Sequence, residues 1–215
     1  MQTNFVSQFE ELLSPDERKI VAGLDTPFNI SQFLDTVRYP SGERNRSVLN
    51  VLREKDAHCL DGGLFAAAML NRIGFPAVII DLHPEPGTDD DHVLAVFRQN
   101  NGWGCVAKSN FAGLRYRDPV YRSLRELVMS YFEVYFNAVG QKTLRGYSRP
   151  VRLDSFRSRN WLVEDEGVDD IEKHLEHLKS FPLITAEMAA NLSIVDKRSM
   201  DAGMLGVNRE GLYKG

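Results

Sequence analysis

The chain has 215 residues, of which 43% are hydrophobic and 26% are charged, as in an ordinary globular protein. No apolar run approaches the roughly 20 residues that a membrane-spanning helix needs, so we expect no membrane partner. The net charge is −4 and no nucleic-acid-binding motif accompanies it, which argues against nucleic acid as a partner.

Apolar spacing and capping residues predict several short helices in the first quarter of the chain. They are expected over residues 4–13 and 15–24, from a cap near Asn29, and over residues 44–54. Residues 59–73 are apolar or small on almost every side, which is typical of a buried helix. Gly62 and Gly63 each cost about 1 kcal/mol relative to alanine inside that helix. We therefore expect another backbone, or a substrate, to approach its first turn.

Strands are predicted next, over residues 77–82, 92–98 and 103–109, the last two forming a hairpin. The later elements are an amphipathic helix over 120–138, an extended region over 141–160, an acidic surface helix over 168–180 and a weakly patterned tail. The tail is a lid, an arm for homo-oligomerisation or partly disordered. The sequence thus predicts an α+β fold, with one domain over residues 1–160 and a C-terminal acidic helix and tail over 161–215.

The N-terminal residues lack the basic start and apolar core of a signal peptide. Two cysteines provide no disulfide framework, so we expect free thiols in a reducing cytoplasm and no cofactor. Cys59 begins the buried helix, where partial positive charge favours a thiolate. We therefore expect its pKa to lie below the usual value of about 8.5. The alternative is an inert core cysteine, which is the interpretation favoured for Cys105.

The hairpin determines which residues lie beside His92. Depending on the turn, His92 pairs with Ser109, Asn110 or Phe111. A neutral imidazole needs an acceptor for its second N–H, and either Asn110 or Ser109 can provide one. The nearest downstream carboxylate is Asp118, beyond a predicted loop.

Arginine is concentrated in residues 111–160, which hold 10 basic and 4 acidic residues. These arginines either pair with the acidic flanks or bind an anionic group on the substrate with two parallel hydrogen bonds. Arg115 and Arg117 follow the hairpin and are candidates to face the cleft. Asp89, Asp90 and Asp91 lack the spacing of a calcium loop and are expected in a solvated loop. We expect no metal at His174 and His177, because no cysteine pair or third ligand accompanies them.

The order of these elements resembles the transglutaminase-like branch of the papain-related cysteine enzymes, as a bacterial-type member of unassigned function. The matching features are Cys59 at the start of a buried helix, His92 at the head of a strand, Trp103 in the hairpin and the run of residues 108–110. The resemblance covers roughly residues 45–112. It implies a papain-like core in which the cysteine helix packs on an antiparallel sheet. Most members have aspartate at the third position, whereas papain-like relatives use asparagine, so the resemblance assigns that role to Asn110.

The leading hypothesis is acyl transfer or hydrolysis on an amide or thioester, within a small molecule or peptide. Cys59 attacks the carbonyl, His92 acts as base and acid, and Asn110 orients His92. Residues expected to orient His92 or contact the substrate are Ser109, Lys108, His58, Trp103, Arg115 and Arg117. The alternative is a catalytically inactive binding module with the same fold. A third interpretation is a metal-dependent hydrolase using Cys59, His92 and an acid from residues 89–91.

Overall fold

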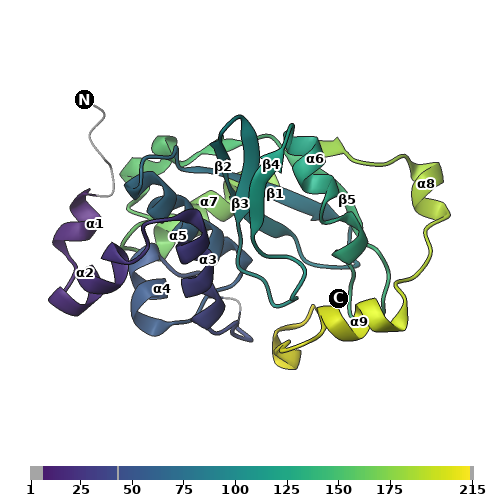
Figure 1. Ribbon diagram of the computed structural model, residues 1–215, viewed down its shortest axis with the longest axis horizontal. Helices are drawn as coiled ribbons and strands as arrows, with labels where there is room; N and C mark the ends of the chain where they lie inside the picture. The colour runs from purple at the N-terminus through teal and green to yellow at the C-terminus, as the bar shows by residue number, and fades with distance from the viewer. Residues whose placement is uncertain (1–6, 43, 214–215) are drawn as a thin grey trace.

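One antiparallel sheet forms the centre of the fold in the computed structural model, which describes residues 7–42 and 44–213 (Figure 1). In this part of the chain the sheet has seven strands in the order β4-β3-β2-β1-β5-β7, and β6 pairs with β1. The strands are β1 (Val78–Pro84), β2 (His92–Gln99), β3 (Gly102–Val106), β4 (Arg117–Tyr121), β5 (Leu144–Ser148), β6 (Val151–Arg152) and β7 (Ser180–Pro182). The sheet and its helices confirm the α+β class.

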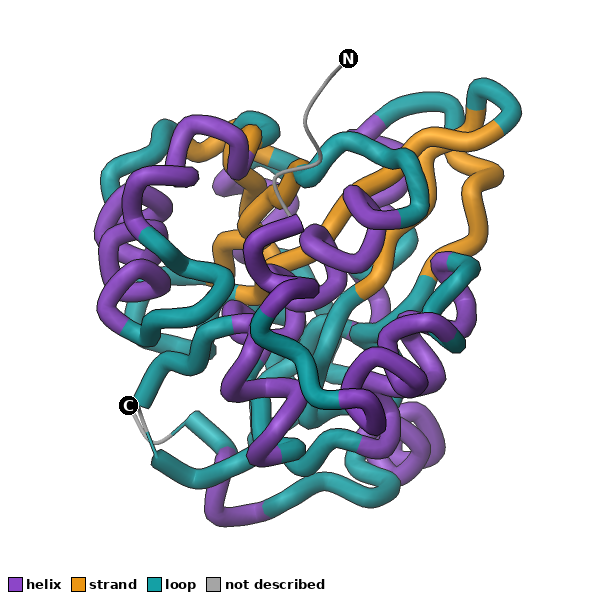
Figure 2. Tube along the Cα trace, turned by 90° about the vertical axis from the view of Figure 1, so that its left-hand side faces the viewer, coloured by secondary structure: helices purple, strands orange, loops and turns teal. Residues whose placement is uncertain are grey.

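Helices lie to both sides of the strands, which are orange in Figure 2. The α-helices are α1 (Ser7–Glu11), α2 (Pro15–Ala22), α3 (Pro27–Thr36), α4 (Val48–Glu54), α5 (Cys59–Arg72), α6 (Leu124–Met129), α7 (Glu166–Glu176), α8 (Ala186–Ala190) and α9 (Lys197–Gly203). Short 3-10 turns are η1 (Phe132–Val134), η2 (Leu153–Arg159) and η3 (Arg209–Gly211). Helix α3 begins earlier than the cap expected near Asn29, because the Thr26 hydroxyl accepts the Asn29 N–H.

Helix α5 is buried from Leu60 to Leu70, as its all-round apolar pattern predicts. It packs on one face of the sheet, against β2. A Cβ added at Gly62 would lie 2.2 Å from the Lys108 Cβ, and one at Gly63 would lie 2.8 Å from the Val93 Cγ1. The two glycines therefore let β2 and the residues after β3 approach the first turn of α5.

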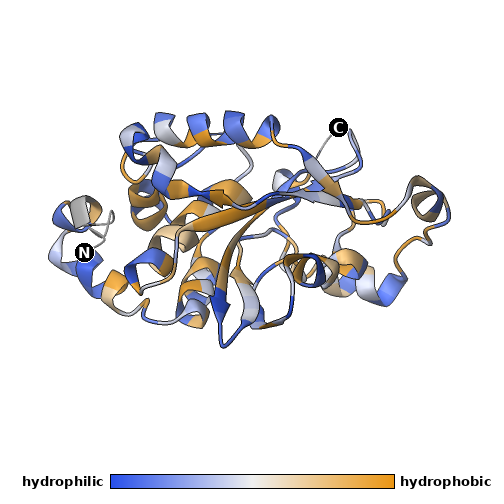
Figure 3. Cartoon of the chain, turned by 90° about the horizontal axis from the view of Figure 1, so that it is seen from above, coloured by the Kyte–Doolittle hydropathy of each residue, from blue (hydrophilic) through white to orange (hydrophobic). Residues whose placement is uncertain are grey.

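Residues 124–135 cover the opposite face of the sheet. The prediction of a single helix over residues 120–138 is wrong. Strand β4 ends at Tyr121, α6 stops at Met129 and a 3-10 turn follows. The chain is divided because Ser123 accepts the Glu126 N–H and starts a new helix there. Figure 3 shows hydrophobic residues concentrated on the central elements between these layers.

The C-terminal residues continue the same core and sheet. Helix α7 buries Val168, Ile171 and Leu175 in the core shared with α5, and β7 pairs with β5. The chain then runs through α8 and α9 and returns towards the middle of the molecule (Figure 1). Residues 161–182 are therefore packed on the main domain and do not stand apart from it. In the described part, no helix is long and apolar enough to cross a membrane.

The β2–β3 hairpin has a two-residue loop. Gln99 pairs with Gly102, and the loop residues Asn100 and Asn101 have positive φ angles of 50° and 64°. These angles are typical of a type I′ turn. The pairing ends at Ala95 and Val106, in the register for which His92 was expected to face Ser109.

Candidate functional site

The start of α5 is held by hydrogen bonds to the buried carboxylate of Asp61. The His58 N–H donates to one oxygen at 3.1 Å and the Arg46 N–H to the other at 2.8 Å. Asp61 is the third residue of the helix, where an acid satisfies free N–H groups and the helix dipole. This arrangement fixes the position of Cys59, the first residue of α5.

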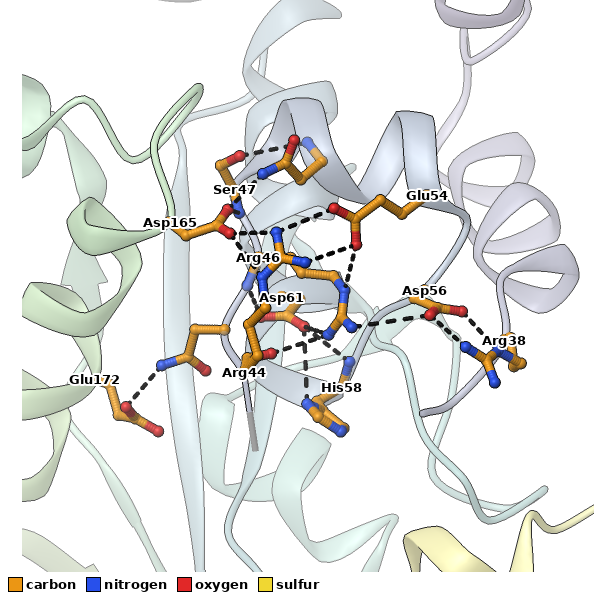
Figure 4. Close-up of polar contacts among 12 residues, drawn as sticks. Arg38, Arg44, Arg46, Ser47, Glu54, Asp56, His58, Asp61, Asp165 and Glu172 are labelled. Atoms are coloured by element: carbon orange, nitrogen blue, oxygen red, sulfur yellow. Dashed lines mark hydrogen bonds and ion pairs between the residues drawn. The ribbon is translucent and has the colours of Figure 1, made fainter. Parts of the chain in front are cut away.

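A network of arginines and acids surrounds this start (Figure 4). The Arg46 guanidinium lies within ion-pair distance of Glu54, Asp56 and Asp61. Arg44 joins Glu54 to Asp165, just before α7. Asn45 donates to Glu172 on α7 at 2.7 Å. The network therefore connects α4, the start of α5 and α7 around the cysteine.

The Cys59 sulfur is a thiol in an acidic cavity, and the residue is partly exposed there. It donates to the Asp91 carbonyl at 3.5 Å. Burial raises its pKa to about 12, and the nearby carboxylates of Asp81, Asp90 and Asp61 also raise it, although a hydrogen bond from the Val93 N–H acts in the opposite direction. The expectation of a lowered pKa is therefore wrong, because burial and negative charge outweigh the helix N-terminus.

His92 lies on the other face of the sheet. Its Nε2 donates to the Leu114 carbonyl at 2.8 Å, and its ring centre is 6.4 Å and 6.3 Å from those of Tyr131 and Tyr135. Its neighbour Val93 packs with α5, and alternate residues of a strand point to opposite faces. Burial lowers the pKa of His92 to about 4, so the ring is neutral. Among the hydrogen bonds of residues 7–42 and 44–213, none joins His92 to Cys59.

None of the described side-chain hydrogen bonds of Asn110 is with His92. The Asn110 Nδ2 donates to the carbonyls of Asn208 and Gly211 at 2.9 Å and 3.2 Å, and its Oδ1 accepts the Asn208 N–H. Ser109 accepts the Phe111 N–H. Asn110 therefore anchors the C-terminal tail, and the hydroxyl of Ser109 closes a local turn.

The remaining predicted residues have structural contacts. Lys108 donates to the carbonyls of Leu34, at 2.8 Å, and Val37, near the end of α3. Arg115 pairs with Asp35. Arg117 donates to Ser130 and lies 4.0 Å over the Tyr131 ring, and Trp103 packs against the core on that same face. His58, by contrast, lines the cavity that contains Cys59.

That cavity has a volume of about 540 Å³. An adjoining cavity of about 300 Å³ contains His92, Ser109 and Asn110. Both are lined by Tyr39, by Asp90 and Asp91, and by the tail at residues 211–213. The structure therefore brings Cys59 and His92 to two neighbouring cavities rather than to one reaction centre.

Sequence reasoning missed Asp81, which lines the Cys59 cavity from β1. It also missed Tyr39 and the α7 acids Glu172 and Glu176. An acid within the otherwise apolar run of β1 is the signal that would have found Asp81, because a charged residue is rarely fully buried without a partner. Within the described ranges, no group of three or more His, Cys, Asp and Glu residues is arranged to hold a metal ion.

The chain matches no known protein-family model, and no curated protein is significantly similar to it in sequence.

Proposed function

We propose that this protein is a catalytically inactive binding module of the transglutaminase-like type, which takes a small ligand in the cavity at Cys59. One observation supports the proposal: the three side chains expected to form a catalytic triad make their hydrogen bonds elsewhere and not with one another. The Cys59 thiol donates to the backbone carbonyl of Asp91, the His92 ring donates to the backbone carbonyl of Leu114, and the Asn110 amide binds the C-terminal tail.

The cavity itself supports ligand binding. Its volume of about 540 Å³ lies within the range of small-molecule sites, roughly 300–1,000 Å³. Polar and aromatic groups from six separate stretches of the chain line it, among them Tyr39, His58, Asp81 and Glu176. Such convergence of polar groups on a concave surface is typical of a binding site.

The first test separates binding from chemistry. Wild-type protein and Cys59→Ser are incubated with p-nitrophenyl acetate, a general acyl donor, and followed by p-nitrophenolate release and intact mass. We expect equal, slow release and no acyl adduct on Cys59. A compound panel spanning positive, neutral and negative charge is then screened by thermal shift. Binders should stabilise wild type and Cys59→Ser alike, and should lose their effect in Cys59→Phe, which fills the cavity.

A second candidate is the thiol enzyme, in which Cys59 forms an acyl intermediate. It is favoured by the position of Cys59, which is partly exposed in a cavity at the start of a helix. His92 would have to turn to the other face of the sheet, or His58 would have to act as the base. An acyl adduct on Cys59 whose formation is abolished by His92→Ala or His58→Ala would establish this candidate and contradict the binding module.

A further inference from the structure

The cavity at Cys59 is strongly acidic. No lysine or arginine is among the described residues that line it, and its one histidine, His58, has a pKa lowered by burial. The carboxylates that line it are Asp81, Asp90, Asp91, Glu172, Glu176 and Glu210. This charge is the opposite of what an anionic substrate group requires.

Asp81 provides an independent indication of a ligand. It is only 3% exposed, and its Oδ1 has no hydrogen-bond partner in the described part of the chain. The rest of the carboxylate is partnered: its Oδ2 lies 3.5 Å from the His83 Nε2, and the backbone N–H groups of Leu82 and His92 also stabilise its charged form. A buried carboxylate oxygen without a partner is rare in folded proteins, because it gives up its hydration without compensation. An N–H donor from a ligand in the cavity would satisfy it.

The acids lie on two sides of the cavity. Asp81 and Asp91 come from β1 and from the residue before β2, whereas Glu172 and Glu176 are one turn apart on α7 and so share a face. Asp91 is exposed as a whole, but partial desolvation of its carboxyl and the neighbouring Asp81 raise its pKa to about 7. The carboxyl groups of Asp81 and Asp91 therefore oppose each other's ionisation, and a bound cation allows both to be negatively charged.

We infer that the cavity binds a small organic cation, whose ammonium or guanidinium group donates to Asp81 while its body extends towards Glu172 and Glu176. Tyr39 also lines this cavity, where its ring lies in edge contact with His58, and an aromatic ring attracts positive charge. The inference rests on the proposed function, because it names the ligand class of the same cavity.

The test measures binding by isothermal titration at constant ionic strength. The probes are agmatine and 1,5-diaminopentane as cations, 1,5-pentanediol as a neutral compound of similar size and glutarate as an anion. Variants are Asp81→Asn, Glu172→Gln combined with Glu176→Gln, and Glu187→Gln on the exposed helix α8 as a matched loss of charge elsewhere. The double variant keeps the test decisive if Asp81→Asn does not fold.

We expect both cations to bind, with pentanediol and glutarate at least tenfold weaker. Asp81→Asn and the double α7 variant should each weaken agmatine at least tenfold, whereas Glu187→Gln should not change it. The inference is overturned if no cation binds, if pentanediol binds equally well, or if the acidic variants keep full affinity. It is also overturned if Mg²⁺ or Ca²⁺ alone binds at Asp81 and excludes agmatine. If pentanediol or glutarate binds instead, and Cys59→Phe abolishes that binding, the protein is still a binding module but the inference of a cationic ligand fails. Cys59-dependent turnover would remove the inactive module while leaving cation selectivity intact.

Discussion

The reactivity of Cys59 against pH tests the electrostatics of its cavity most directly. An unperturbed thiol has a pKa of about 8.5 to 9, and that of Cys59 is about 12. At pH 7.5 this difference reduces the thiolate population by about a thousandfold, equivalent to about 4 kcal/mol. A more basic thiolate is also intrinsically more nucleophilic, with a Brønsted coefficient of about 0.4–0.5, which recovers about twentyfold. We therefore expect alkylation about 50-fold slower than that of a free cysteine derivative.

The assay is iodoacetamide labelling followed by intact mass, in a Cys105→Ala background, with N-acetylcysteine as the reference. The logarithm of the rate should rise linearly from pH 6 to pH 10 without a plateau. Adding Asp81→Asn should accelerate labelling several-fold at pH 7.5, because the Asp81 carboxylate raises the Cys59 pKa. Adding Glu187→Gln, on α8, should not.

A plateau between pH 6 and pH 8 would refute this reasoning. It would mean that the thiolate is already stabilised near neutrality, as in a thiol–imidazole pair. Loss of that plateau in His92→Ala would then restore His92 as the partner of Cys59, and would require the ring to leave Leu114.

Three further outcomes follow from the contacts. Gly62→Ala should destabilise the protein by at least about 2 kcal/mol in urea unfolding, because the new Cβ meets Lys108 at 2.2 Å, whereas Gly42→Ala, with nothing within 4 Å, should be neutral. The folded pKa of His92 is about 4 against an ordinary 6.5, so the unfolded state binds its proton more readily and stability falls as the pH drops through that window. The stability of wild type relative to His92→Gln should therefore fall by about 3 kcal/mol between pH 7 and pH 4 in denaturant titrations. Asn110→Ala should make the C-terminal tail more accessible to trypsin, whereas Ser109→Ala should not, because Asn110 forms three hydrogen bonds with the tail and the Ser109 hydroxyl bonds Phe111.

Local signals predicted much of the fold. Pro15 marked the start of α2, and the apolar residues on nearly every side of α5 indicated its burial. A short helix was also expected over 44–54, where α4 forms over Val48–Glu54 without the Ser47 cap having been recognised. The Asn100–Asn101 turn limited the hairpin to a few registers, one of which forms. The broken segment after β4 was not predictable in the same way, because apolar spacing does not reveal where a serine starts a new helix.

Which face of the sheet carries His92 is a different kind of question. Alternation fixes only that His92 and Val93 point to opposite sides. Where one face is polar, the pattern shows which side is buried, but here both sides are apolar: Val93 and Ala95 pack with α5, whereas Leu94 and Val96 pack with the residues after β4. The sequence therefore does not show whether the odd-numbered or the even-numbered residues of β2 face α5. A resemblance in the order of residues does not show it either.

The same alternation explains why the cysteine lies among acids. Asp81 pairs with Val93 across the β1–β2 ladder, so it shares the α5 side with Val93 and lies near Cys59. Leu82 pairs with His92 on the opposite side. With this register, Cys59 lies beside a carboxylate rather than an imidazole. A one-residue shift of β2 would exchange the residues on the two faces of the sheet. It would also turn Val93 away from Gly63, although the Val93 side chain occupies the space that a side chain at Gly63 would need. The close packing of α5 on the sheet therefore also determines that the Cys59 cavity is acidic.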